Sequence, residues 1–167
     1  CYSEVNLDVM KSDNMTALKE GTQKMDKASR SIWGTSSIPS DSNFKPGGTG
    51  IVVFSRVSSR LLKSGVDSLG RWTYMLLNAK GNKEILVISI YQCCKTPTNA
   101  TGNTAYHQQK ILLSEKNRKD TDPRRNFYKD LKKFIHSFIT RAGIKTVPIL
   151  LGDFNEECIG TSNSVSY

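Results

Sequence analysis

The chain has few of the residues that build zinc-binding, disulfide-rich or membrane proteins. It holds 4 cysteines and 2 histidines among 167 residues. The cysteines, at positions 1, 93, 94 and 158, lack a C-x-x-C spacing, which argues against zinc and favours reduced thiols. No window approaches the roughly 20 apolar residues of a membrane-spanning helix, so no transmembrane segment is expected. We expect an intracellular protein, with the nucleus as one option.

Acidic residues are also scarce relative to basic ones. Asp and Glu number 15 against 24 Lys and Arg, which gives a net charge of +9. Between His107 and Lys145, eleven basic residues stand against four acidic ones, so this region alone carries +7. Such an excess suits a polyanion, either nucleic acid or an anionic lipid surface. It is equally typical of a solvated helix face that keeps a protein in solution.

Hydrophobic periodicity and turn residues predict alternating helices and strands. The pattern favours helices over 12–29 and 104–116, a surface loop over 33–48, and strands over 49–57, 71–79 and 84–92. Gly81 and Asn82 should join the last two strands in an antiparallel hairpin. Asp122 and Pro123 should begin a third, amphipathic helix that Gly143 closes, and 146–155 should be a buried strand. We interpret residues 1–167 as one domain, an α/β sandwich with its chemistry at the strand ends.

The segment "LLGDFNEE" at 150–157 places acidic and amide side chains directly after an apolar strand. Asp153 and Asn155 alternate with Phe154, so the two polar side chains should share one face of the strand while the phenyl ring packs on the other. Together they could orient a water molecule and bind a phosphate oxygen. A purely structural turn at a strand end is the alternative.

Several short motifs occur in the order typical of one enzyme superfamily. They are "GGTGI" at 47–51, "GR" at 70–71, a tyrosine ending the strand "ILVISIYQ" at Tyr91, and "GDFNE" at 152–156. With "SEVNLD" around Glu4, the chain resembles the endonuclease/exonuclease/phosphatase superfamily, whose fold is DNase I-like. The wider pattern, "GGT…SR…LGRWTY…YQ…TAYHQQ…DPRRNF…GDFNE", is similar to the endonuclease domains found beside reverse transcriptases in mobile elements.

The resemblance implies a divalent-metal phosphodiesterase, in particular an endonuclease, on a four-layered α/β sandwich. Glu4 would hold Mg²⁺ or Mn²⁺, a hard cation suited to carboxylate oxygens. Asp153 would orient or deprotonate the attacking water, Asn155 would hold a phosphate oxygen, and Tyr91 would steady the same group as charge develops.

The helix that Asp122 and Pro123 begin supplies a candidate nucleic-acid surface, with DNA favoured over RNA. Its apolar residues fall on one side, so basic residues on or beside the other side can reach phosphates without disturbing the core. The candidates are Arg124, Arg125, Lys129, Lys132 and Lys133. Sequence alone leaves the oligomeric state open.

The chain also departs from the superfamily pattern. Gln92 and two cysteines follow Tyr91 where relatives carry an asparagine, and the closing Asp-His pair has no counterpart after Asp153. We therefore expect a truncated, partial domain that is inactive by itself, cut from an active parent. Two other readings stay open: a non-catalytic nucleic-acid-binding module of the same fold, and a phosphatase acting on phosphoinositides or small phosphoesters.

Overall fold

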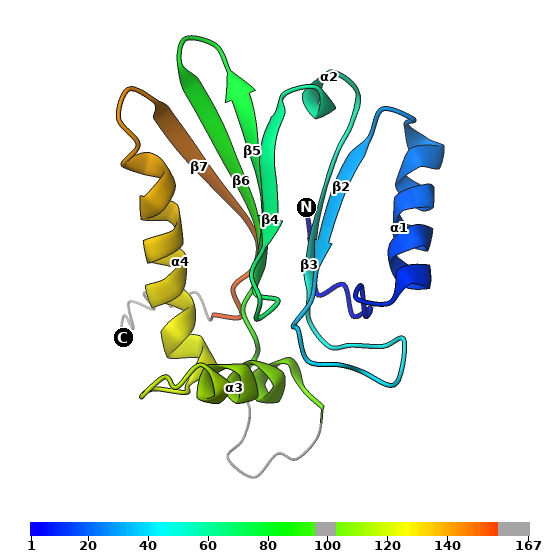
Figure 1. Cartoon of the computed structure of the whole chain (residues 1–167), viewed down its shortest axis with the longest axis vertical. Helices are drawn as coiled ribbons and strands as arrows, with labels where there is room; N and C mark the ends of the chain where they lie inside the picture. Colours follow the sequence, from blue (N-terminus) through cyan, green and yellow to red (C-terminus); the bar gives the residue numbers. More distant parts are fainter. Residues whose placement is uncertain (96–102, 157–167) are drawn as a thin grey trace, which may run out of the picture.

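A computed structural model describes residues 1–95 and 103–156 of the chain (Figure 1). The fold is mixed α/β, and these residues form two sheets and four helices. The last eleven positions of the predicted domain, 157–167, which include Cys158, lie outside the described residues. None of the described helices combines the length and apolar character needed to cross a membrane.

The smaller sheet has three antiparallel strands. β1 (Tyr2–Ser3) and β2 (Arg30–Gly34) pair on either side of β3 (Thr49–Val53), so the order is β1-β3-β2. Helix α1 (Ser12–Met25) contacts β2 and lies outside this sheet (Figure 1). The sheet therefore has one side toward α1 and the other toward the larger sheet.

The larger sheet has four strands in the order β4-β5-β6-β7. β4 (Leu61–Val66), β5 (Trp72–Ala79) and β6 (Lys83–Tyr91) are antiparallel, and β7 (Lys145–Asp153) runs parallel to β6. The predicted hairpin between β5 and β6 is confirmed. Gly81 and Asn82 in its loop have φ of 69° and 53°, the left-handed conformation that these two residue types tolerate best.

The other helices lie at either end of the sheets or outside the larger sheet (Figure 1). α2 (Ser55–Ser58) is a single turn, α3 (Ala105–Glu115) begins at the cap Thr104, and α4 (Pro123–Ile139) contacts β7. As the sequence predicts, the carboxylate of Asp122 caps α4 by accepting the backbone N–H of Arg124 and Arg125 at 2.8 and 3.1 Å. The helix ends at Ile139, so the prediction that Gly143 closes it is wrong by one turn.

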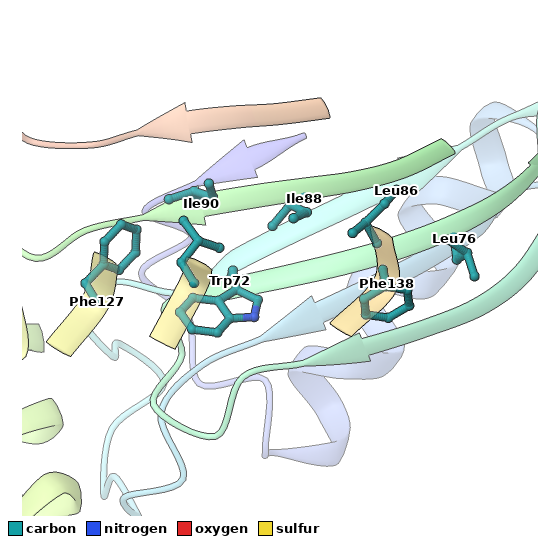
Figure 2. Close-up of a cluster of buried hydrophobic side chains, with 8 residues drawn as sticks. Trp72, Leu76, Leu86, Ile88, Ile90, Phe127 and Phe138 are labelled. Carbon is teal, nitrogen blue, oxygen red and sulfur yellow. The ribbon is translucent and has the colours of Figure 1, made fainter. Parts of the chain in front are cut away.

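The apolar side of α4 covers one face of the larger sheet. Figure 2 shows Phe127 and Phe138 of the helix over Trp72, Ile88 and Ile90 of the sheet, all of them buried. Trp72 meets Phe127 edge-on, with ring centroids 6.0 Å apart. A second cluster, built on Ile51, Val53, Met75 and Leu77, fills the space between the two sheets. These two cores fix the strand ends that carry the candidate site.

Some elements differ from the sequence prediction. β2 and β4 were not predicted, the predicted loop over 33–48 begins inside β2, and the predicted strand over 49–57 ends at Val53. β7 is a strand, as expected, but not a buried one. Val147, Ile149 and Leu151 are 43%, 41% and 46% exposed, because the smaller sheet does not fully cover their face of β7.

Candidate functional site

The end of β6 brings Tyr91 to Glu4, which lies 87 positions away in the sequence. Tyr91 is buried, and its hydroxyl donates a hydrogen bond to Glu4 Oε1 at 3.3 Å. Burial first, and the negative charge of Glu4 second, raise the pKa of Tyr91 well above its usual range. The phenol therefore keeps its proton at neutral pH and acts as a hydrogen-bond donor.

Backbone contacts hold Glu4 in place beyond the short strand β1. Ser89 Oγ of β6 donates to the Tyr2 carbonyl at 2.7 Å, and the Asn6 N–H donates to the Gly47 carbonyl at 2.8 Å. Glu4 itself has φ of 56°, a conformation uncommon for a residue with a long side chain. Such strained positions are often found at functional sites, where the surrounding structure maintains them.

The first glycine of "GGTGI" packs against the tyrosine. A Cβ on Gly47 would lie 3.1 Å from the Tyr91 ring and 3.2 Å from the Ala105 side chain, and Gly47 also has φ of 87°. A larger residue here would push the ring away from Glu4 and strain the backbone. This motif, noticed in the sequence for its resemblance, thus has a local packing role.

β7 places Asp153 beside Tyr91. The two residues are register partners in the parallel pair β6–β7, so their side chains leave the sheet on the same face. Gly152 makes this pairing possible, because a Cβ at that position would overlap the Ile90 backbone and the residue has φ of 137°. Phe154 packs into the core under α4, as the alternation predicted.

Asn155 lies just past the strand end and is held by its own local bonds. Its backbone N–H donates to Asp153 Oδ1 at 2.8 Å, and its side-chain Nδ2 donates to the Gln92 carbonyl at 2.6 Å. Cys94 Sγ is 3.3 Å from Asn155 Oδ1. With φ of 45°, Asn155 adopts the left-handed conformation, which asparagine tolerates better than most residues.

Four predicted site residues thus come from three segments and meet at one end of the sheets. Glu4 follows β1, Tyr91 ends β6, and Asp153 and Asn155 come from the end of β7. Their side chains offer the separate carboxylates of Glu4 and Asp153, one protonated phenol and one amide. Such a set can bind a phosphate group and accept a proton from water.

The candidate site could bind a hard cation such as Mg²⁺ only with few protein ligands. Across residues 1–95 and 103–156, no group of three or more His, Cys, Asp or Glu side chains could hold a metal ion. Mg²⁺, however, usually takes one or two carboxylates and completes its shell with water and substrate phosphate. Glu4 is exposed and offers a carboxylate oxygen, so it fits Mg²⁺ or Mn²⁺ of this kind.

The basic residues of α4 fall into two groups. Arg125, Lys129, Lys132 and Lys133 are exposed, and the first three recur at steps of four and three along one stripe of the helix. Arg125 and Lys129 reach the carboxylates of Asp120 and Asp122 across 3.5 to 3.8 Å. Arg124 is different, since its side chain is only 11% exposed and turns toward the strand ends.

Two residues of this region were not predicted to support the site. Gln92 is buried, and in the amide orientation that satisfies its neighbours its nitrogen donates to the Phe154 carbonyl and to Glu156 Oε1. It therefore braces the loop after β7. The second of these residues is Ser89, whose hydroxyl donates to the Tyr2 carbonyl. Both lie on β6 or just after it, but neither residue type carries a recognisable motif.

Comparisons of the chain with known protein families, with curated proteins and with solved structures found no match in any of the three.

Proposed function

We propose that the chain is part of an endonuclease/exonuclease/phosphatase domain that hydrolyses phosphodiester bonds in nucleic acid, DNA before RNA, with Mg²⁺ or Mn²⁺. One observation carries the proposal. The buried hydroxyl of Tyr91 donates to Glu4, and Asp153 is the register partner of Tyr91. Residues that the superfamily resemblance assigned to the site, from distant parts of the sequence, therefore lie at one sheet end, which a set of unrelated structural turns would not be expected to do.

The arrangement of elements supports a DNase I-like, four-layered sandwich as the fold of the complete domain. Helix α1, the smaller sheet, the larger sheet and α4 follow one another across Figure 1. The half-exposed apolar residues of β7 share the face of Ile85 and Val87, which packs toward the smaller sheet. An incompletely covered face of this kind supports the proposal that the domain is partial.

The protein side chains would divide the work as follows. The cation held by Glu4 would neutralise negative charge on the phosphate. Asp153 Oδ1 is already engaged by the Asn155 N–H, which leaves its second oxygen to accept a proton from water. Asn155 uses one N–H of its amide on the Gln92 carbonyl, so the other can reach a phosphate oxygen. Tyr91 has one O–H, which now donates to Glu4, and it would turn this donor to the same phosphate when Glu4 binds the cation.

The exposed basic stripe of α4 supports a polyanionic substrate. Arg125, Lys129 and Lys132 follow one another along the helix from the end that contacts the site loops. The ion pairs of Arg125 and Lys129 are on the surface, where such pairs contribute little, so phosphates could replace the carboxylates. A small phosphoester would not need a stripe of this length.

Plasmid nicking by the full-length polypeptide that contains residues 1–167 tests the function. Asp153→Asn keeps an oxygen to accept the Asn155 N–H but removes the base, so we expect the Mg²⁺-dependent rate to fall on the order of a hundredfold or more. Asp13→Asn, an equal charge change in α1, should leave the rate unchanged. Equal nicking by wild type and a well-folded Asp153→Asn variant would reject the proposal. DNA binding without nicking by wild type would favour the non-catalytic binding module.

A further inference from the structure

Arg124 connects three segments at the candidate site. Its Nη1 donates to the Cys93 carbonyl at 2.7 Å, just after β6, and its Nη2 donates to the Asn155 carbonyl at 2.9 Å, just after β7. The same Nη2 lies 2.7 Å from Glu156 Oε1. The guanidinium, fixed in the first turn of α4, thus ties the helix to the ends of both parallel strands.

The neighbouring Arg125 provides a natural comparison. Its side chain is 69% exposed, against 11% for Arg124, and its guanidinium lies 3.5 Å from the carboxylates of Asp120 and Asp122. The two residues have the same charge and stand in the same helical turn. Of the two, only Arg124 donates hydrogen bonds to carbonyl oxygens at the strand ends. The N–H groups that make these bonds are then not available to a nucleic-acid phosphate.

The bonds of Arg124 act on Asn155, whose backbone conformation is left-handed. Asn155 is held by Arg124 through its carbonyl, by Asp153 through its N–H, and by the Gln92 carbonyl through its side chain. Hydrogen bonds from a charged donor are stronger than neutral ones, and a planar guanidinium can bridge two acceptors at fixed spacing. Without this bridge, the Cys93 and Asn155 carbonyls would lose the guanidinium that they share, and Glu156 would lose its ion pair.

We propose that Arg124 is a positioning residue that holds Asn155 in its phosphate-binding orientation and does not itself contact nucleic acid. This inference rests on the proposed function for the role of Asn155, but the bonds that carry it are independent of any activity. It also separates Arg124 from the four exposed basic residues of α4, with which sequence reasoning had grouped it.

Three variants of the full-length polypeptide test the proposal. Arg124→Gln removes the charge and the bridge, Arg124→Lys keeps the charge but cannot bridge, and Arg125→Gln removes a neighbouring charge without touching the bridge. Amide hydrogen exchange by NMR at Asn155 should accelerate roughly tenfold or more in both Arg124 variants and stay at the wild-type rate in Arg125→Gln.

Binding and turnover supply the second readout. Arg125→Gln should flatten the salt dependence of binding to a labelled duplex by roughly one unit of log-log slope, whereas both Arg124 variants should keep the wild-type slope. In nicking assays both Arg124 variants should lower kcat with little change in KM. The reason is that a displaced Asn155 amide would lose a hydrogen bond to the phosphate that acts mainly in the transition state.

The opposite pattern would overturn the proposal. If Arg124→Lys behaves as wild type while Arg124→Gln flattens the salt slope, Arg124 contacts phosphate through its charge. Should Arg124→Gln fail to fold, Arg124→Lys decides alone, and wild-type exchange at Asn155 in that variant rejects positioning. The proposed function fails separately: if Asp153→Asn retains full activity while exchange at Asn155 still accelerates in the Arg124 variants, the bridge holds and the nuclease assignment does not.

Discussion

At the scale of single residues, the buried hydroxyl of Tyr91 is the centre of the account. A phenol whose pKa is raised by burial and by Glu4 stays protonated, so it offers a fixed donor beside two carboxylates. Glu4 accepts the hydrogen bond of this hydroxyl, and it does so from an exposed position with an uncommon backbone conformation. The pair couples the first few residues of the chain to the end of β6, and this coupling gives Glu4 a role that its place in the sequence does not suggest.

Replacing Glu4 should change the metal dependence of activity. Because a neutral amide binds a hard dication far less well than a carboxylate, Glu4→Gln should raise the half-saturating concentration of Mg²⁺ or Mn²⁺ on the order of tenfold. Glu20→Gln, an equal change on the exposed side of α1, serves as the control. The effect is measured by following the nicking rate as a function of metal concentration. Identical curves for Glu4→Gln and wild type would mean that Glu4 is a solvated surface residue and not a metal ligand.

Sequence reasoning identified the candidate residues that lie together at one end of the sheets, but not the contacts between them. Asp153 and Asn155 could be identified locally, because their spacing around Phe154 places them at one strand end. The bond between Tyr91 and Glu4 could not be derived that way, since it depends on how β1 pairs with β3. Arg124 and Arg125 look alike in a sequence, and only their different directions from the helix separate a buried bridge from an exposed charge.

At the scale of elements, the parallel pair of β6 and β7 carries the site and depends on Gly152. A side chain there would overlap the Ile90 backbone in the neighbouring strand. Gly152→Ala should therefore destabilise the fold by roughly 2–4 kcal/mol. Gly21→Ala is the matched control, because a Cβ at that position in α1 meets nothing within 4 Å and should stabilise by up to about 1 kcal/mol.

Urea denaturation of the three proteins measures this difference. We expect the urea concentration at the unfolding midpoint to fall in Gly152→Ala and to stay the same or rise in Gly21→Ala. An unchanged midpoint in Gly152→Ala would mean that β7 can shift away from β6 at no cost, and the register that places Asp153 beside Tyr91 would then lose its support.

Elements with strong local signals were predictable and short ones were not. The hairpin of β5 and β6 has a clear turn, and α4 has a cap, a first-turn proline and a regular apolar side. β2 is five residues long, and β4 is an edge strand with a register shift between Leu61 and Lys63, so neither shows a regular alternation. Their pairing partners, and not their own sequence, make them strands.

At the scale of the whole molecule, two facing sheets bring distant segments to one end. β1 approaches β6 and β7, so Glu4 meets residues that follow it by 87 and more positions. α4 then closes this end through Arg124 and carries its exposed basic stripe away from it. We therefore propose that Glu4 and Asp153 belong to a single site.

A double-mutant cycle on the cleavage rate tests that central claim most directly. Glu4→Gln, Asp153→Asn and the double variant of the full-length polypeptide are compared with wild type in single-turnover cleavage of a labelled duplex with Mg²⁺. We expect each single change to slow cleavage on the order of a hundredfold and the double variant to be little slower than the slower single one, because residues that act as a unit are not additive. A wild-type rate in either single variant, or losses that multiply in full, would contradict a shared site.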